Sequence, residues 1–309
     1  MKTFYSKLFV MAFALCLSLT SRAEVANVDG VYQLVTAEDM LEFAQIVLEN
    51  DGQVDAVLTA DIDMSAYPEF SISSADISYK GVFDGQFHVV TIGYENNNNQ
   101  YVSLFRKLGD GTIKNLAVNG SLHAIGQHCA PLVGQSAGTG TIENVFVDVA
   151  LNTTTEGDAS HGGLIGSVTS SSNVTINNCL VGGSIKSDDF VSSQCGGVIG
   201  WCDGKATLNS VMVICDFEIG GNDNGTWGNL TFVRNPGNAI LNNCYYLNPL
   251  DVVDANAKHI TAEELVNGAA CYALNVGNAQ DAWFQTLDVD MFPVPNPSHA
   301  KVYRIVRSH

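Results

Sequence analysis

Five segments in the middle of the chain repeat one pattern of apolar and polar positions. Each contains an apolar residue, a polar residue, a residue that is Asn in four of the five segments, and a second apolar residue. The first apolar positions are Ile113, Ile142, Ile176, Leu208 and Leu241, and the polar positions after them are Lys114, Glu143, Asn177, Asn209 and Asn242. Alternation with a period of two predicts β-strands that bury one face, not helices.

The third position of the pattern forms a column with a nearly constant repeat length. It is occupied by Asn115, Asn144, Asn178, Ser210 and Asn243, at spacings of 29, 34, 32 and 33 residues. Strands that recur at such a period bury their apolar faces by stacking turn upon turn, with parallel neighbours about 4.8 Å apart. We therefore expect an all-β fold, a right-handed parallel β-helix (β-solenoid) of about five to six coils. The side chains of Asn115, Asn144, Asn178 and Asn243 would form a structural hydrogen-bond ladder along its axis.

Glycines and flanking segments define the corners and ends of the array. Gly134, Gly166 and Gly200 follow the first strand in three coils, where a corner is obstructed by a Cβ atom. Residues 79–92 are expected to form either a hairpin or a degenerate first coil. Thr36 and Thr261 each precede an acidic residue three positions later and an apolar run with helical spacing. This predicts a short amphipathic helix at each end of the solenoid, as a cap over the strand edges.

The first residues indicate export. Residues 1–23 contain Lys2 and Lys7, an apolar run from 8 to 19, and Ser21-Arg22-Ala23, which together are typical of a signal peptide. The apolar run is shorter than the roughly 20 residues that a spanning helix needs, so no membrane span is expected after cleavage. We assign residues 24–56 to an N-terminal capping segment with a helix, 57–250 to the β-helix repeat domain with regular coils over 101–250, and 251–309 to a C-terminal helix and strand cap.

The net charge of the chain argues against one class of binding partner. The formal charge is −18, and it falls to −21 when Lys2, Lys7 and Arg22 leave with the signal peptide. Nucleic-acid binding depends on Lys and Arg clusters that displace counterions, and the sequence contains no such cluster. We therefore expect an acidic protein that is secreted or held at the cell surface and that binds no nucleic acid.

Glycine-rich strand motifs add a resemblance to a known family. The motifs GGLIG at Gly162 and CGGVIG at Cys195, with the strands TIENVFV and TINNCLV, resemble the GLUG-motif repeats of exported surface proteins of Bacteroidetes. The resemblance covers roughly residues 100 to 250. It implies a β-helical surface or adhesive region with no established catalytic residues. Phe105-Arg106, where other coils have an aliphatic residue and Gly, and Ser210 in the Asn column depart from the pattern.

One column of side chains invites a metal hypothesis. Cys129, His161 and Cys195 occupy equivalent positions, but Cys129 and Cys195 would be two coils, or about 9 to 10 Å, apart. That separation is too large for a shared zinc ion or a disulfide. We therefore interpret the column as structural and most of the cysteines as small buried hydrophobic residues. Cys195 with Cys202 is the more plausible bridge if one forms.

No cofactor is expected, with calcium as the open alternative. Asp61, Asp63 and Asp84 could hold calcium in an extracellular setting. Asp84 is followed by Gly, however, and that pair is first a turn signal.

Two classes of function remain. The acidic residues of the coils do not fall into aligned pairs on one strand face, as a glycoside hydrolase requires. We therefore favour a secreted or cell-surface structural or binding (adhesin-like) solenoid with no catalytic residues, whose partner is a glycan or a host or cell-surface protein. The alternative is a carbohydrate-active β-helical enzyme, either a polysaccharide lyase or a glycoside hydrolase.

Overall fold

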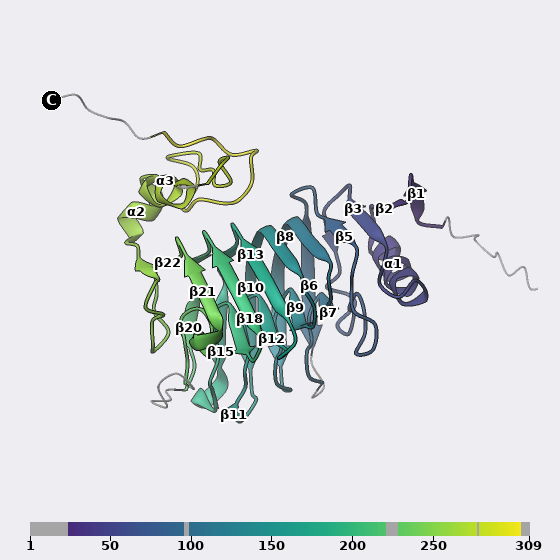
Figure 1. Ribbon diagram of the computed structural model, residues 1–309, viewed down its shortest axis with the longest axis horizontal. Coiled ribbons are helices and arrows are strands. Elements are labelled where there is room, and N and C mark those ends of the chain that lie inside the picture. The colour runs from purple at the N-terminus through teal and green to yellow at the C-terminus, as the bar shows by residue number, and fades with distance from the viewer. Residues whose placement is uncertain (1–23, 96–98, 221–227, 277, 304–309) are drawn as a thin grey trace, which may run out of the picture.

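The computed structural model describes residues 24–95, 99–220, 228–276 and 278–303, and the expected signal peptide at residues 1–23 lies outside them. The described residues form a mostly β structure, a parallel β-solenoid of about six turns (Figure 1). No helix among them is long and apolar enough to cross a membrane.

Two sheets form the walls of the solenoid, with the main core between them. The large sheet has 17 strands: β1 (Ala26–Val28), β2 (Val31–Leu34), β3 (Asp55–Leu58), β4 (Ile62–Asp63), β5 (Val82–Asp84), β6 (Val89–Glu95), β8 (Thr112–Ala124), β10 (Thr141–Thr153), β13 (Asn173–Asn177), β14 (Leu180–Val181), β15 (Ser184–Ser187), β18 (Lys205–Asn209), β19 (Met212–Val213), β20 (Asp216–Glu218), β21 (Ala239–Asn242), β22 (Tyr245–Tyr246) and β23 (Lys258–His259). The small sheet has four strands: β7 (Phe105–Leu108), β9 (Val133–Ser136), β12 (Ile165–Val168) and β17 (Ile199–Cys202). A third, two-stranded sheet contains β11 (Gly157–Asp158) and β16 (Ser192–Ser193). The helices are α1 (Ala37–Glu49), α2 (Ala262–Val266) and α3 (Ala269–Asn275), with the short 3-10 turns η1 (Asp188–Phe190) and η3 (Pro236–Asn238).

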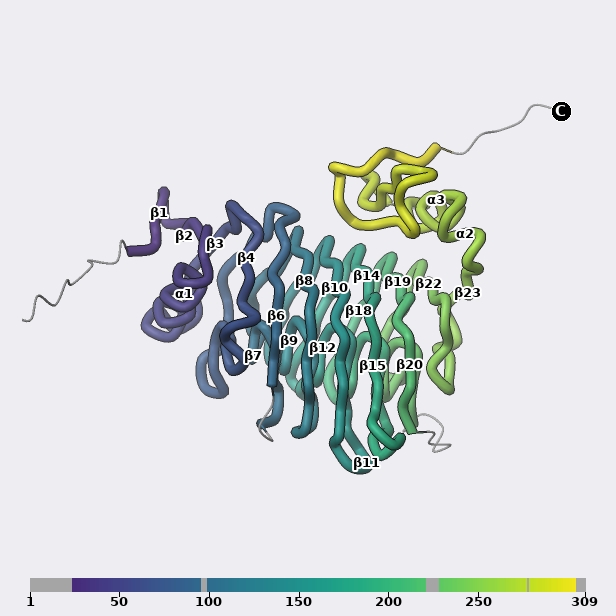
Figure 2. The backbone as a smooth tube through the Cα atoms, turned by 180° about the vertical axis from the view of Figure 1, so that it is seen from behind, coloured from purple at the N-terminus to yellow at the C-terminus, as the bar shows by residue number. Residues whose placement is uncertain are grey.

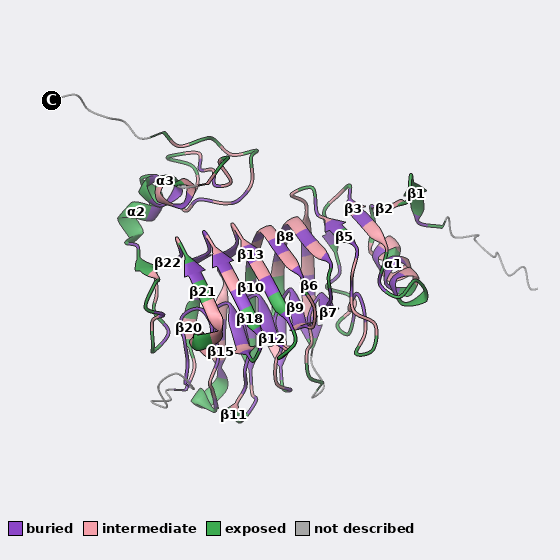
Figure 3. Ribbon diagram, in the orientation of Figure 1, coloured by how far each residue is buried: buried purple, intermediate pink, exposed green. Residues whose placement is uncertain are grey.

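Successive turns align the repeat in register, as the sequence predicts. The strands pair parallel so that one inward column runs through Ile113, Ile142, Ile176, Leu208 and Leu241. The first four side chains are fully buried, and Leu241 is 8% exposed. Figure 3 shows how buried positions alternate with half-buried ones along the strands of the large sheet.

The Asn column marks a corner of left-handed backbone. The φ angles are 51° at Asn115, 53° at Asn144, 50° at Asn178, 52° at Ser210 and 55° at Asn243. Asn adopts this conformation more readily than most residues, because its short amide hydrogen-bonds locally. The backbone geometry of the corner therefore accounts for the recurrence of Asn in the sequence.

Residues 79–92, for which the sequence left a hairpin and a degenerate coil open, form a parallel turn. β5 pairs parallel with β3 and β8, and β6 pairs parallel with β4 and β8. The solenoid therefore begins before the five repeat segments.

The N-terminal end is closed by α1. Thr36 begins the helix with a capping box, in which its hydroxyl accepts from the N–H of Asp39 and the Asp39 carboxylate accepts from the N–H of Thr36. Phe43 of this helix packs on Tyr79 and Phe83, with ring centroids 6.3 and 6.2 Å away. The helix thus covers the aromatic core of the first turn.

The C-terminal helices lie along the side of the last turns and not across the open end (Figure 2). α2 begins at Thr261 with the expected capping box. Together with Trp283, α2 and α3 form a second apolar core over Leu180, Met212 and Tyr245 of the large sheet. The physical reason for this placement is that these three residues are apolar at outward positions, so this side of the solenoid needs a cover.

Residues 250–254 close the last turn from the C-terminal side. Thr231 donates its backbone N–H to the carbonyl of Val252 (2.9 Å), and Phe232 donates its N–H to Oδ2 of Asp254 (3.0 Å). Asp254 is only 6% exposed, and its Oδ1 has no hydrogen-bond partner among the described residues. Burial therefore raises the pKa of this carboxyl group from 3.8 to about 6.

Replacing Asp254 by Asn should stabilise the protein above pH 6. A carboxyl pKa that is raised in the folded state makes the free energy of unfolding fall as pH rises from about 4 to 6, because ionisation is then disfavoured only in the native state. The gain above pH 6 should approach about 3 kcal/mol, since the shift is about two pKa units and one unit corresponds to roughly 1.4 kcal/mol. Urea unfolding from pH 4 to 8 measures it, with the exposed Asp76→Asn as control. Parallel pH profiles for Asp254→Asn and the unmodified protein would contradict the prediction.

Candidate functional site

A polar groove follows the outer face of the small sheet across several turns. It has a volume of about 420 Å³ and is lined by Tyr101, Gln127, His128, Gln135, Asp158, Ser160, Ser167, Val168, Thr169, Ser170, Trp201, Asp203 and Arg234. Gln135, Ser167 and Trp201 occupy one register column of β9, β12 and β17, which continues the column from Lys107 of β7. Three steps between parallel strands make this column about 14 Å long. The groove therefore runs along the solenoid axis and not around one turn.

Arg234 organises the floor of the groove. Its side chain is only 4% exposed, and its two terminal nitrogens donate to the two carboxylate oxygens of Asp158 at 2.8 and 3.2 Å. The guanidinium also donates to Oγ of Ser160 (2.5 Å) and to the side-chain oxygen of Gln194. Its Cζ lies 4.7 Å from the ring centroid of Trp201. Because the planar guanidinium group donates to three side chains and lies over a fourth, it fixes the positions of these neighbours.

Aromatic rings lie at both ends of the groove. Trp201 occupies the end nearest the C-terminus, and Tyr101 stacks on His128 at the other end, with ring centroids 5.2 Å apart and planes at 11°. Tyr101 also lines an adjoining hollow with Arg106, whose Cζ lies 5.8 Å from the tyrosine ring. The recessed surface therefore continues past Tyr101 towards the N-terminal turns.

His128 contributes a polar atom that has no partner. Its Nδ1 is buried and accepts or donates no hydrogen bond within the described part of the chain. Burial lowers the pKa of this histidine, with the Arg234 charge acting in the same direction and Asp158 opposing it. The imidazole is therefore neutral at neutral pH and can accept a hydrogen bond from a ligand hydroxyl.

The glycines singled out in the sequence make room for the corner that carries these residues. Tyr101, His128, Ser160 and Gln194 all have positive φ, one in each turn. A Cβ atom on Gly166 would lie 1.8 Å from the carbonyl oxygen of His128, and one on Gly200 would lie 2.0 Å from that of Ser160. Glycine is needed because the corner backbone packs directly on the strand.

The predicted Asn ladder lies outside the groove and is interrupted after Asn144, whose Oδ1 has no partner among the described residues. Asn144 donates from Nδ2 to Oδ1 of Asn115 (3.0 Å), and Asn115 donates in turn to Asp84 (3.0 Å). The next members contact the C-terminal segment: Asn178 accepts from Asn278 (3.4 Å), and Asn243 donates to the carbonyls of Ala273 and Leu274 and to Ser210. These side chains hold the turns and the C-terminal segment together.

The three carboxylates considered for calcium are engaged separately. Asp61 contacts Nδ1 of His88 (3.0 Å) and the N–H of Val89, while Asp63 accepts from the N–H of Ser65 (2.9 Å). Asp84 accepts from Asn115 and pairs with a lysine of the neighbouring strand. Over the described residues, no three His, Cys, Asp or Glu side chains are grouped as a metal site.

The Cys129, His161 and Cys195 column is buried. Nδ1 of His161 accepts from the N–H of Cys129 (3.2 Å), which leaves Nε2 to donate to Oγ1 of Thr153 (2.9 Å). Burial lowers the pKa of His161 to about 3. All seven cysteines after residue 23 are buried, and Cys195 and Cys202 are free thiols that form no bridge with each other. Both histidine nitrogens thus have protein partners, as in a structural core position.

Two serines resemble the nucleophile of a hydrolase, one in its sequence motif and one in its neighbouring residues, but neither has the hydrogen-bond geometry of a nucleophile. Gly134-Gln135-Ser136-Ala137-Gly138 has the G-x-S-x-G spacing of a nucleophile elbow, which sequence reasoning missed. Ser136, however, lies in strand β9, is fully buried and bonds to the hydroxyl of Ser172 at 2.8 Å. In the groove, Ser160 donates to Asp158 (2.8 Å) and accepts from Arg234. A triad serine instead donates to histidine.

One solved structure has a similar fold. It is the crystal structure of a "putative immunoglobulin A1 protease" from Bacteroides ovatus, with a TM-score of 0.61 and 16% sequence identity, covering 88% of this chain and 94% of that chain. At this identity the likeness shows the fold alone. No protein-family model and no curated protein matches the chain. The resemblance to GLUG repeats therefore stays a prediction.

Proposed function

We propose that the protein is a secreted or cell-surface glycan-binding protein, and that an extended saccharide lies along the groove of the small sheet. One observation carries the proposal: Trp201 and Tyr101 lie about three turns apart, with amide, hydroxyl and carboxylate side chains between them. The apolar face of a sugar ring packs on an aromatic ring, and its hydroxyls bond to such polar groups. A polymer follows a groove that runs along the solenoid axis.

The charges of the groove favour a neutral saccharide. The only described basic residue that lines it is Arg234, and both of its terminal nitrogens already donate to Asp158. Asp203 is exposed at the same surface, and the whole chain carries a formal charge of −18. A uronic or sialic acid would meet net repulsion here, whereas neutral hydroxyls can bond to both carboxylates.

A glycan array with the purified chain tests the proposal. Neutral oligosaccharides should bind. For the tightest of them, calorimetry should give an affinity for Trp201→Ala that is at least about tenfold lower than for the unmodified chain, because the contact between the sugar and the aromatic ring is lost. Asp203→Ala should weaken binding with little effect on stability, since this residue is exposed. Tyr303→Ala is the control, because Tyr303 is 71% exposed and lies outside the groove.

Two outcomes would contradict glycan binding in the groove. Either no saccharide binds above background, or a saccharide binds and both groove variants bind it as tightly as the unmodified chain. The same oligosaccharides and a mixture of peptides should be analysed for shortened products. If the unmodified chain cleaves one of these substrates and Asp203→Ala does not, the function of this groove is hydrolysis and not binding alone.

A further inference from the structure

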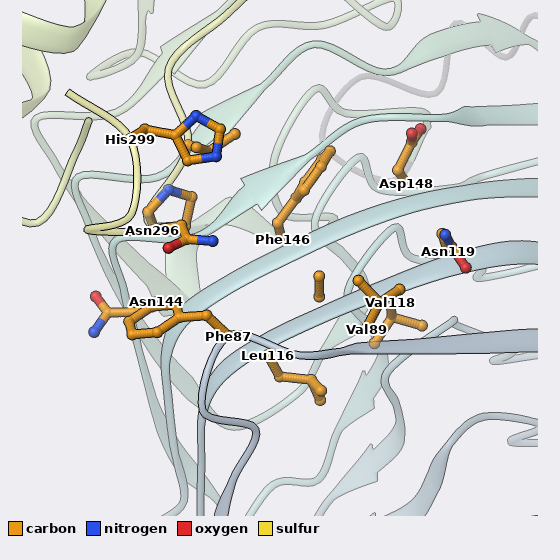
Figure 4. A pocket seen from close by; sticks show the side chains of 13 residues that line it. Phe87, Val89, Leu116, Val118, Asn119, Asn144, Phe146, Asp148, Asn296 and His299 are labelled. Atoms are coloured by element: carbon orange, nitrogen blue, oxygen red, sulfur yellow. The ribbon is translucent and has the colours of Figure 1, made fainter. Parts of the chain in front are cut away.

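A second hollow lies between the C-terminal segment and the large sheet (Figure 4). Its floor is a register column of outward residues, Val89 of β6, Ala117 of β8 and Phe146 of β10. The same column continues through Leu180 to Met212, where α2 and α3 cover it. Ala117 is small between larger neighbours, and this leaves a cleft of about 290 Å³. A volume near the lower limit of roughly 300 Å³ for ligand pockets suits a small molecule.

The walls of this cleft are largely apolar. Phe87 and Phe146 line it from the solenoid, and Val294 and Pro295 line it from the C-terminal segment. Phe146 packs edge-on against Phe292, with ring centroids 5.8 Å apart, which ties the wall to the floor. Such a surface binds the apolar body of a ligand, and two phenyl rings favour an aromatic one.

Two polar atoms of the cleft are hydrogen-bond acceptors without a donor among the described residues. Oδ1 of Asn144 and Oδ1 of Asn119 are buried, and neither has a partner within the described residues. The orientation of Asn144 is fixed because its Nδ2 donates to Asn115, whose own amide donates to the Asp84 carboxylate. A buried acceptor without a donor is unfavourable, so a ligand that supplies N–H groups gains by binding here.

The charge around the cleft favours a cation. Asp148 is exposed and lines it, while none of its described lining residues is Lys or Arg. His299 lines the roof, with its Nδ1 at 2.7 Å from Oδ2 of Asp290. The formal net charge of the whole chain is −18, and its electrostatic field also attracts cations.

We propose that this cleft is a binding site for a small organic amine with an aromatic or branched aliphatic body. The ring lies over Ala117 between Phe87 and Phe146, and the ammonium group donates to Oδ1 of Asn119 and faces Asp148, which is paired with Asn119 in the strand register. The proposal rests on a different surface from the saccharide groove and does not depend on it.

Calorimetry with 2-phenylethylamine as the probe tests this site. The amine should bind, and 3-phenylpropionate, which carries a carboxylate on a similar body, should bind at least tenfold more weakly. Ala117→Phe places a large side chain on the floor of the cleft and should abolish binding. Val89→Phe fills the same space from the adjacent strand. Loss of binding in either variant, if it is folded, supports the site. Asp148→Asn should weaken binding about threefold, as expected for an exposed ion pair.

Matched variants exclude indirect effects. Asp188→Asn removes an exposed carboxylate outside the cleft, and Trp201→Ala alters the saccharide groove; both should bind the amine as the unmodified chain does. The proposal is overturned if the amine does not bind, if the carboxylate probe binds equally well, or if folded Ala117→Phe and Val89→Phe retain full affinity.

Discussion

Replacing Trp283 by Ala is expected to release the C-terminal segment while the solenoid stays folded. Trp283 is fully buried in the second apolar core with Leu180 and Met212, which is distinct from the main core inside the solenoid. Truncating a buried Trp typically costs about 3 to 5 kcal/mol, a large part of the roughly 5 to 15 kcal/mol that stabilises a domain. This cost falls on the packing of α2 and α3 against the side of the last turns.

Two measurements distinguish local release from general destabilisation. Calorimetric unfolding of Trp283→Ala should show a new transition at low temperature, followed by the main transition of the solenoid. Limited proteolysis should cleave within residues 255–303 before the repeats are cut. The uncovered strip of Leu180, Met212 and Tyr245 should also promote self-association at high concentration. Met291→Ala is the control because Met291 is 70% exposed. A single transition and unchanged proteolysis would show that the segment is not held by this core.

The repeat region could be predicted from the sequence because one physical constraint recurs in every turn. An inward position such as Ile142 must be apolar, and a left-handed corner such as Asn144 favours Asn, so both signals accumulate over five segments. The N-terminal helix was predictable for a local reason. Its capping box at Thr36 and Asp39 lies within four residues.

The groove could not be predicted because its repeat positions carry a different residue type in each turn. Asp158 and Arg234 are 76 positions apart and meet only when the turns stack. Trp201 and Tyr101 lie at positions that other turns fill with unrelated side chains, such as Ser167 and Ser160. The glycines that follow the corner were the one available signal, since each lies in the strand on which the corner of the preceding turn packs.

The position of the C-terminal helices was missed for a different reason. The sequence shows where α2 begins, but not which surface it covers. The informative feature was the pair of consecutive apolar residues in three later turns, Leu180-Val181, Met212-Val213 and Tyr245-Tyr246. A strand with apolar residues on both faces is covered on both faces, so this pattern indicates a partner on the outer side of the solenoid.

Replacing Gly166 by Ala should destabilise the whole solenoid and distort the groove. The added Cβ atom would lie 1.8 Å from the carbonyl oxygen and 2.5 Å from the carbonyl carbon of His128. These are backbone atoms of the adjacent turn, so no side-chain rotation relieves the overlap, and strand β12 must move away from the corner. Overpacking of this kind costs about 3 kcal/mol or more. Because the displaced corner carries His128, saccharide binding should weaken together with stability.

Gly237→Ala is the matched control for this substitution. No described atom lies within 4 Å of the position that its Cβ would occupy, so its free energy of unfolding should change by less than about 0.5 kcal/mol. Urea unfolding of both variants gives the comparison, and calorimetry with the bound saccharide reports on the groove. If Gly166→Ala unfolds at the same urea concentration as Gly237→Ala, the corner does not need glycine for steric reasons. The recurrence of glycine at this position would then have to follow from ligand binding, because the groove is the surface that this corner supports.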